Sequence, residues 1–269
     1  MISFLVPVIT MTALGLVFSL GLVFAYKKLA VQVDPRVEKI NAALPQANCG
    51  ACGFAGCQAL AEAIAAGKAE PGSCPVGGAE AVSRIAEILG VQAGEVIKKV
   101  ARLHCRGTHQ AAPKRSRYLG LQTCFAAHLM GGDKLCTYGC LGLADCVRAC
   151  PFDAMAMGED GLPVIFEDKC TACGKCIQAC PRNLLELHPT NQNILVFCRS
   201  KDRPQVSRKA CQNACIACNI CARACPEAII MKDNLAVITD YKKIPPEKIP
   251  EIERCPTGAI GRLKKNDEG

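Results

Sequence analysis

Cys170-Thr-Ala-Cys173-Gly-Lys-Cys176-Ile-Gln-Ala-Cys180-Pro181 is the stretch of the sequence that decides the fold. Its four cysteines are separated by two, two and three residues, and a proline follows the last one. This spacing is typical of thiolates that hold [4Fe–4S] clusters, and where two clusters are present the fourth cysteine of a run binds the other cluster. The stretch therefore predicts a pair of clusters and a second cysteine run that completes them.

The partner run lies directly upstream and keeps the Cys-Pro ending, although two of its gaps are longer by one and three residues. It consists of Cys136, Cys140, Cys146 and Cys150, followed by Pro151. Crossed ligation predicts one cluster on Cys136, Cys140, Cys146 and Cys180, and another on Cys150, Cys170, Cys173 and Cys176. Between the runs, Met155-Ala-Met and Leu162-Pro-Val-Ile-Phe predict two short paired strands, so we expect the βαββαβ fold of a bacterial ferredoxin.

A third run follows, at Cys215, Cys218, Cys221 and Cys225-Pro226. The stretch after it repeats the pattern found after Cys150-Pro151. At the position that corresponds to Lys169-Cys170, however, this stretch has Lys242-Lys243, and the next cysteine is Cys255. We therefore predict a second, degenerate ferredoxin-like module that has lost one cluster. Its remaining cluster would be held by Cys215, Cys218, Cys221 and Cys255. Cys225 would be the ligand of the lost cluster, and it remains a possible iron ligand.

The first cysteine group has a different setting. Cys49, Cys52, Cys57 and Cys74 are interspersed with glycines, which let a loop wrap closely around a cofactor. The stretches 58–66, 79–89 and 93–103 show helical periodicity, and Asp34-Pro35 is a typical helix start. We expect a small helical domain with one four-cysteine site. Zinc is the alternative metal for four cysteines, and for this group alone the sequence leaves that choice open.

Four further cysteines, Cys105, Cys124, Cys198 and Cys211, belong to no run. Free cysteine buries readily, so we expect these to be buried free thiols. The alternative is that some of them join Cys225 around a further cluster. Disulfides are disfavoured throughout, because the 21 cysteines are odd in number and are mostly grouped at metal-ligand spacing. Reduced iron-binding thiolates indicate a reducing compartment.

The N-terminus predicts a membrane anchor. Residues 2–26 carry no charged side chain, and Lys27 and Lys28 follow at once. As a helix this segment is about 37 Å long, enough for a hydrocarbon core of roughly 30 Å. The positive-inside rule predicts a single pass with the N-terminus outside and the bulk of the chain in the cytoplasm. A cleaved signal peptide is the alternative, but the basic n-region is missing and the apolar stretch is too long.

Composition excludes several function classes. The formal charge of +8 is not accompanied by the aromatic residues that a nucleic-acid surface would need, and four clusters at roughly −2 each would offset it. No P-loop or dinucleotide-binding glycine motif is found, and His104, His109, His128 and His188 stand singly. We therefore expect no catalytic residues, no NAD or flavin, and no nucleic-acid partner. The clusters would pass single electrons to partners that carry out the two-electron chemistry.

The order of these parts is similar to that of a known family. The similarity rests on two stretches, Asn48-Cys-Gly-Ala-Cys-Gly-Phe-Ala-Gly-Cys and Cys136-Thr-Tyr-Gly-Cys-Leu-Gly-Leu-Ala-Asp-Cys-Val-Arg-Ala-Cys-Pro-Phe. Together with the membrane helix they resemble RnfB, a subunit of the Rnf complexes, which are the ion-translocating ferredoxin:NAD oxidoreductases of bacteria. The resemblance covers residues 2 to about 189, and the module after Phe197 resembles the longer RnfB chains of anaerobes.

The resemblance implies a role in electron transport. The chain would receive electrons from soluble reduced ferredoxin and relay them to the membrane subunits of a translocase that pumps sodium ions or protons. It would lie in the cell (inner) membrane, in contact with lipid. The alternative is an anchored polyferredoxin that serves a hydrogenase or a redox-sensor reductase.

The expected architecture is an α+β multidomain chain with four [4Fe–4S] clusters. Its parts are a transmembrane anchor (1–26), a helical 4Fe–4S domain (27–104), a linker (105–130) with a flexible basic stretch at 114–118, a two-cluster ferredoxin-like domain (131–190) and the degenerate ferredoxin-like domain (191–269).

Overall fold

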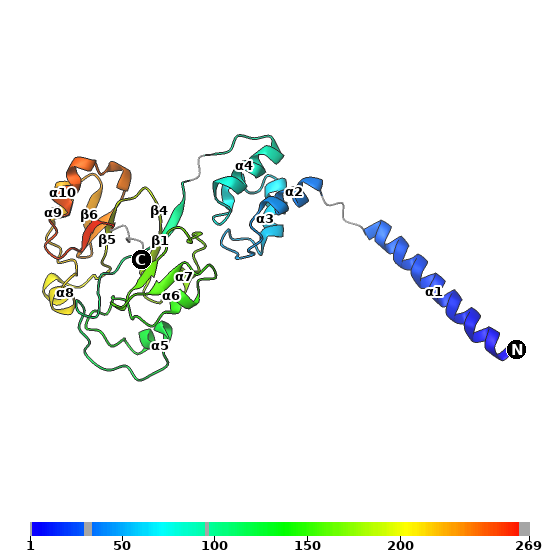
Figure 1. Ribbon diagram of the computed structural model, residues 1–269, viewed down its shortest axis with the longest axis horizontal. Coiled ribbons are helices and arrows are strands. Elements are labelled where there is room, and N and C mark those ends of the chain that lie inside the picture. The colour runs from blue at the N-terminus through cyan, green and yellow to red at the C-terminus, as the bar shows by residue number, and fades with distance from the viewer. Residues whose placement is uncertain (1, 30–33, 95–96, 264–269) are drawn as a thin grey trace.

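The computed structural model describes residues 2–29, 34–94 and 97–263 (Figure 1). Helix α1 (Ile2–Leu29) is 28 residues long, or about 42 Å, and it carries Lys27 and Lys28 in its last turn. Within it, Val8–Lys28 is long and apolar enough to cross a membrane. The Thr12 hydroxyl donates to the Val8 carbonyl at 2.6 Å, so this polar group is satisfied inside the helix, as a lipid environment requires.

The helical domain follows the anchor. Its elements are α2 (Pro35–Ala43), α3 (Cys57–Ala65), a 3-10 turn (Pro71–Ser73) and α4 (Gly78–Leu89). The Asp34 side chain accepts from the Arg36 N–H at 2.9 Å and caps α2, as predicted. Ile40, Leu60, Ile64 and Ile85 are almost completely buried and form its core. The helices predicted at 58–66 and 79–89 are confirmed within one residue.

The helix predicted at 93–103 is wrong for the described residues of that stretch. Residues 99–103 form strand β1 (Lys99–Leu103), which pairs antiparallel with β4 (Leu185–Pro189). Val100 and Ala101 are buried against the cysteine-rich part of the chain. The alanine-rich pattern permits a helix, but pairing with a strand more than 80 residues away decides the local structure.

Strand β1 opens what we call the first cysteine module, residues 97–189. Three short helices and a hairpin separate β1 from β4: α5 (Cys124–Leu129), α6 (Asp145–Arg148), β2 (Met155–Met157), β3 (Pro163–Ile165) and α7 (Lys175–Gln178). Met155 pairs with Ile165 in the hairpin, which confirms the strand pair predicted there. Apart from α5, the order of elements is therefore βαββαβ, and its first strand is supplied by a stretch that the sequence had assigned to the helical domain.

Residues 105–130, predicted as a linker, are part of the same body. They contain helix α5 (Cys124–Leu129) and the buried residues Cys105, Ala111 and Ala112. The basic stretch 114–118 is also fixed in place. The Lys114 ammonium pairs with Asp133 at 2.7 Å, and the Arg115 N–H donates to the Asp133 carbonyl at 2.7 Å. The prediction of a flexible link there is therefore wrong, because Asp133 and the neighbouring glycine carbonyls offer partners that spacing along the chain does not reveal.

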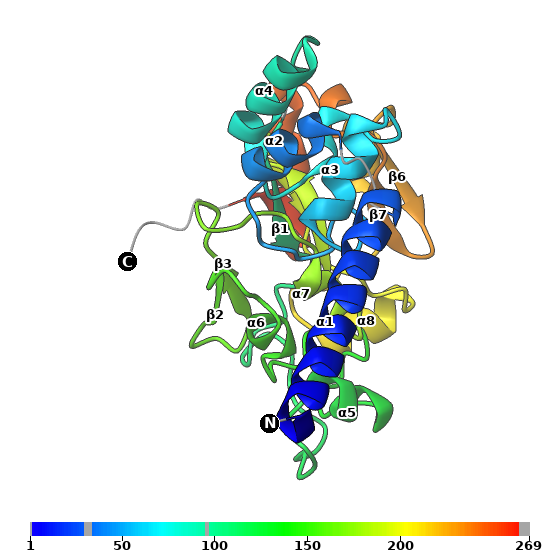
Figure 2. The ribbon, with the colours of Figure 1, turned by 90° about the vertical axis from the view of Figure 1, so that its right-hand side faces the viewer.

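The second cysteine module, residues 194–263, has a closely similar order of elements. Its elements are β5 (Ile194–Val196), α8 (Pro204–Ala210), α9 (Ile220–Ala224), β6 (Ile229–Lys232), β7 (Leu235–Ile238), two 3-10 turns (Tyr241–Lys243 and Pro246–Lys248), α10 (Ile249–Ile252) and β8 (Ile260–Arg262). Figure 2 shows its hairpin strands β6 and β7 and its helix α8. Strand β5 pairs with β8, and β6 pairs with β7, so the first and last strands close this module as they close the first one.

The pairing of β1 with β4 predicts where the cysteine-rich body begins. A fragment of residues 91–269 should fold and bind iron under anaerobic reconstitution. A fragment of residues 131–269 should lose more than half of its iron, because it lacks β1 and the buried segment 105–130. Iron and sulfide analysis of both fragments after gel filtration would check this, and equal iron contents would contradict the boundary.

Candidate iron–sulfur sites

Three short helices present one cysteine each in the same way. Cys146, Cys176 and Cys221 lie on α6, α7 and α9, and all three are buried. The residue before each helix has a left-handed backbone: Ala144 at φ 64°, Gly174 at φ 75° and Asn219 at φ 64°. This conformation turns the chain sharply between successive cysteines, so that thiols two to five residues apart can face one point.

The Cys150 site is formed by Cys150, Cys170, Cys173 and Cys176, which line one cavity together. Burial raises the pKa of the Cys176 thiol to about 11, and the nearby thiols of Cys170, Cys173 and Cys150 add to the rise. The Ala101 N–H, from β1, donates to Cys170 Sγ at 3.5 Å. The structure thus brings together the four residues that the crossed-ligation pattern named for this site.

The Cys215 site is formed by Cys215, Cys218, Cys221 and Cys255 around a second cavity. Burial raises the pKa of the Cys221 thiol to about 11, and Cys215, Cys255 and Cys218 raise it further. Here too the predicted set comes together.

Cys225 does not line the cavity of the Cys215 site. Its buried thiol donates to the Lys243 carbonyl at 3.7 Å, and Ile244, Ile249 and Ile252 belong to the same core. The third residue after Cys150, Cys180 and Cys255 has a positive φ, at Asp153, Asn183 and Gly258, whereas Ala228 after Cys225 does not. The backbone at Cys225 therefore differs from that of the other Cys-Pro turns. Apolar side chains pack around Cys225, at the place where the sequence predicted that a cluster had been lost.

The Cys124 site differs from the predicted set. Cys140, Cys146 and Cys180 line a third cavity, as expected, but the fourth cysteine there is Cys124 instead of Cys136. Burial raises the pKa of the Cys146 thiol to about 12, with Cys124 and Cys180 as the next causes. Cys124 begins α5, whose cap Thr123 accepts from the Ala126 N–H at 3.2 Å. The sequence missed Cys124 because the helix that presents it starts 12 residues before the run, without any spacing motif.

Cys136 lies at a fourth cavity, the Cys105 site, together with Cys105, Cys198 and Cys211. The Cys215, Cys124, Cys150 and Cys105 sites are thus each lined by four cysteines, which is the ligand set of a [4Fe–4S] cluster.

The Cys49 site lies in the helical domain. Cys57 and Cys74 are buried there, and Cys49 and Cys52 are partly exposed. The Asn48 side chain accepts from the Cys57 N–H at 2.9 Å, which fixes the loop against the start of α3. Burial raises the pKa of the Cys74 thiol, and the nearby thiols of Cys52 and Cys57 contribute to the rise. Burial thus makes the free thiolate of Cys74, Cys146, Cys176 and Cys221 unfavourable, so deprotonation of these thiols is expected to accompany metal binding. Cys255 differs, because backbone N–H groups outweigh its burial and lower its pKa.

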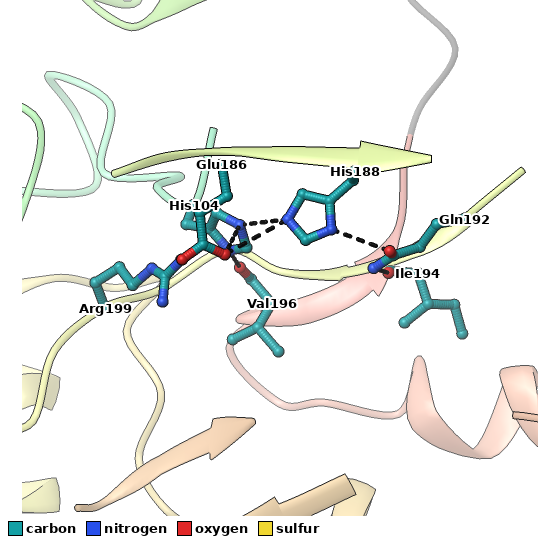
Figure 3. A network of polar contacts seen from close by, with 7 residues as sticks. All are labelled: His104, Glu186, His188, Gln192, Ile194, Val196 and Arg199. Carbon is teal, nitrogen blue, oxygen red and sulfur yellow. Dashed lines mark hydrogen bonds and ion pairs between the residues drawn. The ribbon is translucent and has the colours of Figure 1, made fainter. Parts of the chain in front are cut away.

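A polar network, drawn in Figure 3, flanks the Cys105 site, because His104 and Arg199 also line that cavity. His104 Nδ1 lies 2.7 Å from the Val196 carbonyl, and His188 Nδ1 lies 3.0 Å from Gln192 Oε1, while Glu186 approaches the Nε2 atoms of both rings. These three donors are close enough to hold a small metal ion. Arg199, however, already pairs with Glu186, which disfavours a second cation. We therefore interpret the network as a polar contact between β1, β4 and β5.

The comparisons with known proteins agree with this site chemistry. A family model for an Fe-S cluster matches residues 44–76, and a model for a 4Fe-4S dicluster domain matches residues 135–185. The chain is 46% identical over 260 residues to the RnfB subunit of the Na(+)-translocating ferredoxin:NAD(+) oxidoreductase complex of Acetobacterium woodii, covering 96% of this chain and 78% of that protein. The chain belongs to the RnfB family.

Two other relatives support the same assignment. The RnfB subunit of the proton-translocating ferredoxin:NAD(+) oxidoreductase complex of Clostridium ljungdahlii is 40% identical, with 94% of this chain and 90% of that protein covered. The corresponding subunit of the ion-translocating oxidoreductase complex of Methanosarcina acetivorans is also 40% identical, with 74% and 76% covered. This chain is therefore an iron–sulfur electron-transfer subunit of an ion-translocating ferredoxin:NAD oxidoreductase complex, and the resemblance found in its sequence is confirmed. Family membership favours this role over that of a polyferredoxin serving a hydrogenase.

Replacing Cys124 tests the third cavity. The Cys124→Ala protein should lose about four irons relative to the parent, because its site retains only three thiols. Cys225→Ala is the matched control, since Cys225 is also buried and lies at the end of a short helix, as Cys124 lies at the start of one, and its iron content should not change. Unchanged iron in the Cys124→Ala protein would show that Cys124 is not a ligand.

Proposed function

We propose that this chain relays electrons through four [4Fe–4S] clusters, at the Cys49, Cys124, Cys150 and Cys215 sites, from soluble reduced ferredoxin to membrane subunits of its complex. The observation that carries the proposal is the convergence of four thiols at the Cys124, Cys150 and Cys215 sites. When bound, the clusters supply one-electron chemistry. The protein's own residues hold the thiolates, exclude water and donate N–H groups to sulfur. The two cysteine modules are then tandem ferredoxin-like domains.

The orientation follows from the anchor. We place the N-terminus of α1 outside and the remaining chain on the cytoplasmic side, because Lys27 and Lys28 end the apolar helix and the positive-inside rule keeps such residues in the cytoplasm. The clusters would then lie in the compartment where soluble ferredoxin is reduced. The link between α1 and α2 includes residues 30–33, which lie outside the described residues.

Ferredoxin would dock at the second cysteine module. Exposed basic side chains surround the Cys215 site in sequence: Arg203, Arg208, Lys209, Lys242, Lys243 and Arg254 are all exposed. Other basic residues in the same stretches of sequence either form ion pairs or lie outside the described residues. Arg199 pairs with Glu186, Lys201 with Asp233, and Lys264 and Lys265 are not described. Soluble ferredoxins are generally acidic, so a basic surface beside a cluster suits their docking.

The docking proposal predicts a salt-dependent rate. Reduction of the chain by ferredoxin should slow several-fold as ionic strength rises, because screening weakens long-range attraction. Lys243→Glu should slow it further at low salt. Lys68→Glu, the same change at an exposed lysine of the helical domain, should have little effect. Stopped-flow measurement of cluster bleaching would check this, and a rate that does not depend on salt would contradict it.

The Cys49 site would be the exit toward the membrane subunits, because its domain follows the anchor in the chain. In assembled membranes, a Cys52→Ser protein should still have its other clusters reduced by ferredoxin, while NAD reduction stops. EPR of the reduced clusters and the rate of NADH formation give the two measurements. NAD reduction at the parent rate would show instead that the helical domain is a structural spacer.

A further inference from the structure

The Cys105 site draws its four thiols from both cysteine modules. Cys105 follows β1 and Cys136 precedes α6, whereas Cys198 follows β5 and Cys211 follows α8. All four are 6–8% exposed, and they line one cavity with Gly107, Gly139 and Asn213. Burial raises the pKa of the Cys198 thiol to about 12, with Cys136 among the further causes. Four distant segments thus bring four thiols to one buried point, an arrangement that hydrophobic packing alone does not require.

Backbone N–H groups point at the sulfurs of this site. Cys105 Sγ accepts from the N–H of Gly107 at 3.3 Å and from that of Cys140 at 3.4 Å. Cys198 Sγ accepts from the N–H of Ser200 at 3.4 Å and from that of Cys215 at 3.3 Å. Hydrogen bonds from N–H groups to the ligand sulfurs are a means by which proteins tune iron–sulfur clusters, and two sulfurs of this site accept two such bonds each.

The loop at Gly107 packs closely against the thiols of this site. A Cβ atom there would lie 3.3 Å from Ala112 Cβ, 3.4 Å from Cys105 Sγ and 3.7 Å from Cys211 Sγ. The backbone therefore passes in contact with two of the four sulfurs. Close approach of a glycine backbone to the ligands matches what a wrapped cluster needs.

A buried positive charge beside the site calls for a negative partner. Lys134 is 1% exposed, and its ammonium donates to the Gly107 carbonyl at 2.8 Å. Within the described part of the chain it forms no ion pair with a carboxylate. A buried charge without a counter-charge is strongly unfavourable. A cluster with four thiolates carries roughly −2 and would supply that charge. Burial raises the pKa of both Cys211 and Cys140, and the charge of Lys134 opposes that rise in each case, so Lys134 lies near two of the sites.

We propose that Cys105, Cys136, Cys198 and Cys211 bind a fifth [4Fe–4S] cluster, which carries electrons between the two cysteine modules; the proposal rests on the cluster relay proposed above. The N–H of Cys140, from the Cys124 site, and the N–H of Cys215, from the Cys215 site, each bond to a sulfur of this site. The fifth cluster is therefore one hydrogen bond from a ligand residue of each neighbour. Each transfer moves one electron and no atoms, and oxidises one cluster as it reduces the next.

Iron analysis of the anaerobically purified full-length protein tests the proposal. The parent should contain about twenty irons and as many sulfides, from five clusters of four. The Cys211→Ala protein should lose about four irons, whereas the Cys225→Ala control should keep the parent content. About sixteen irons in the parent, with or without one zinc, would overturn the proposal, because a single zinc is the other occupant that four thiolates fit.

Native mass spectrometry of the parent keeps the test decisive if the Cys211→Ala protein does not fold. Five cluster masses support the proposal, and four refute it. These readouts are separate from the role in the complex. Loss of ferredoxin-dependent NAD reduction in a protein with five clusters would contradict the relay, and it would leave the fifth site intact.

Discussion

The coordination of iron by buried thiolates is the interaction on which the rest of this structure depends. The strands of the cysteine modules have three to five residues, and their cysteine-bearing helices α6, α7 and α9 have four or five. Elements of this length do not persist alone in water. The chain has no tryptophan and few other aromatic residues with which to build a large apolar core. Metal–thiolate bonds replace that core, so folding and cluster insertion are expected to be coupled.

The same constraint explains the repeated architecture. In both modules the first and last strands close around a hairpin, and the short helices turn cysteines toward a cavity. The first module holds two such cavities. In the second module, Ile244 and Ile252 belong to the core around Cys225, and the Cys225 thiol is hydrogen-bonded to the Lys243 carbonyl. A module can therefore lose one cluster when apolar side chains fill the place of that cluster. The condition is that the remaining cluster still links the cysteine-bearing segments of the module.

What could be predicted from the sequence depended on the distance along the chain between residues that meet in space. The Cys150 and Cys215 sites are each built mainly from one run with short gaps, and their sets came together as predicted. Cys124 and Cys136 could not be assigned in the same way, because the thiols they meet lie far along the chain. Cys124 joins Cys140, Cys146 and Cys180, whereas Cys136 joins Cys105, Cys198 and Cys211. The stretch 99–103 was misassigned for a related reason. Its residues permit a helix, and only the partner strand at 185–189 makes them a strand.

Charge links these sites to one another. Lys134 lies inside the first cysteine module, and so does Arg182, whose guanidinium donates to the Cys136 carbonyl at 3.3 Å. Burial lowers the pKa of Arg182, while Cys136, Cys140 and Cys105 oppose that shift. Without thiolates nearby, these two cations would be left in a poorly solvated interior, and the unloaded protein would be destabilised. With clusters bound, they face negative charge from two sites at once. The positions of Lys134 and Arg182 therefore favour a state in which neighbouring sites are filled together, because each cation is best compensated when the cavities on both sides of it carry charge.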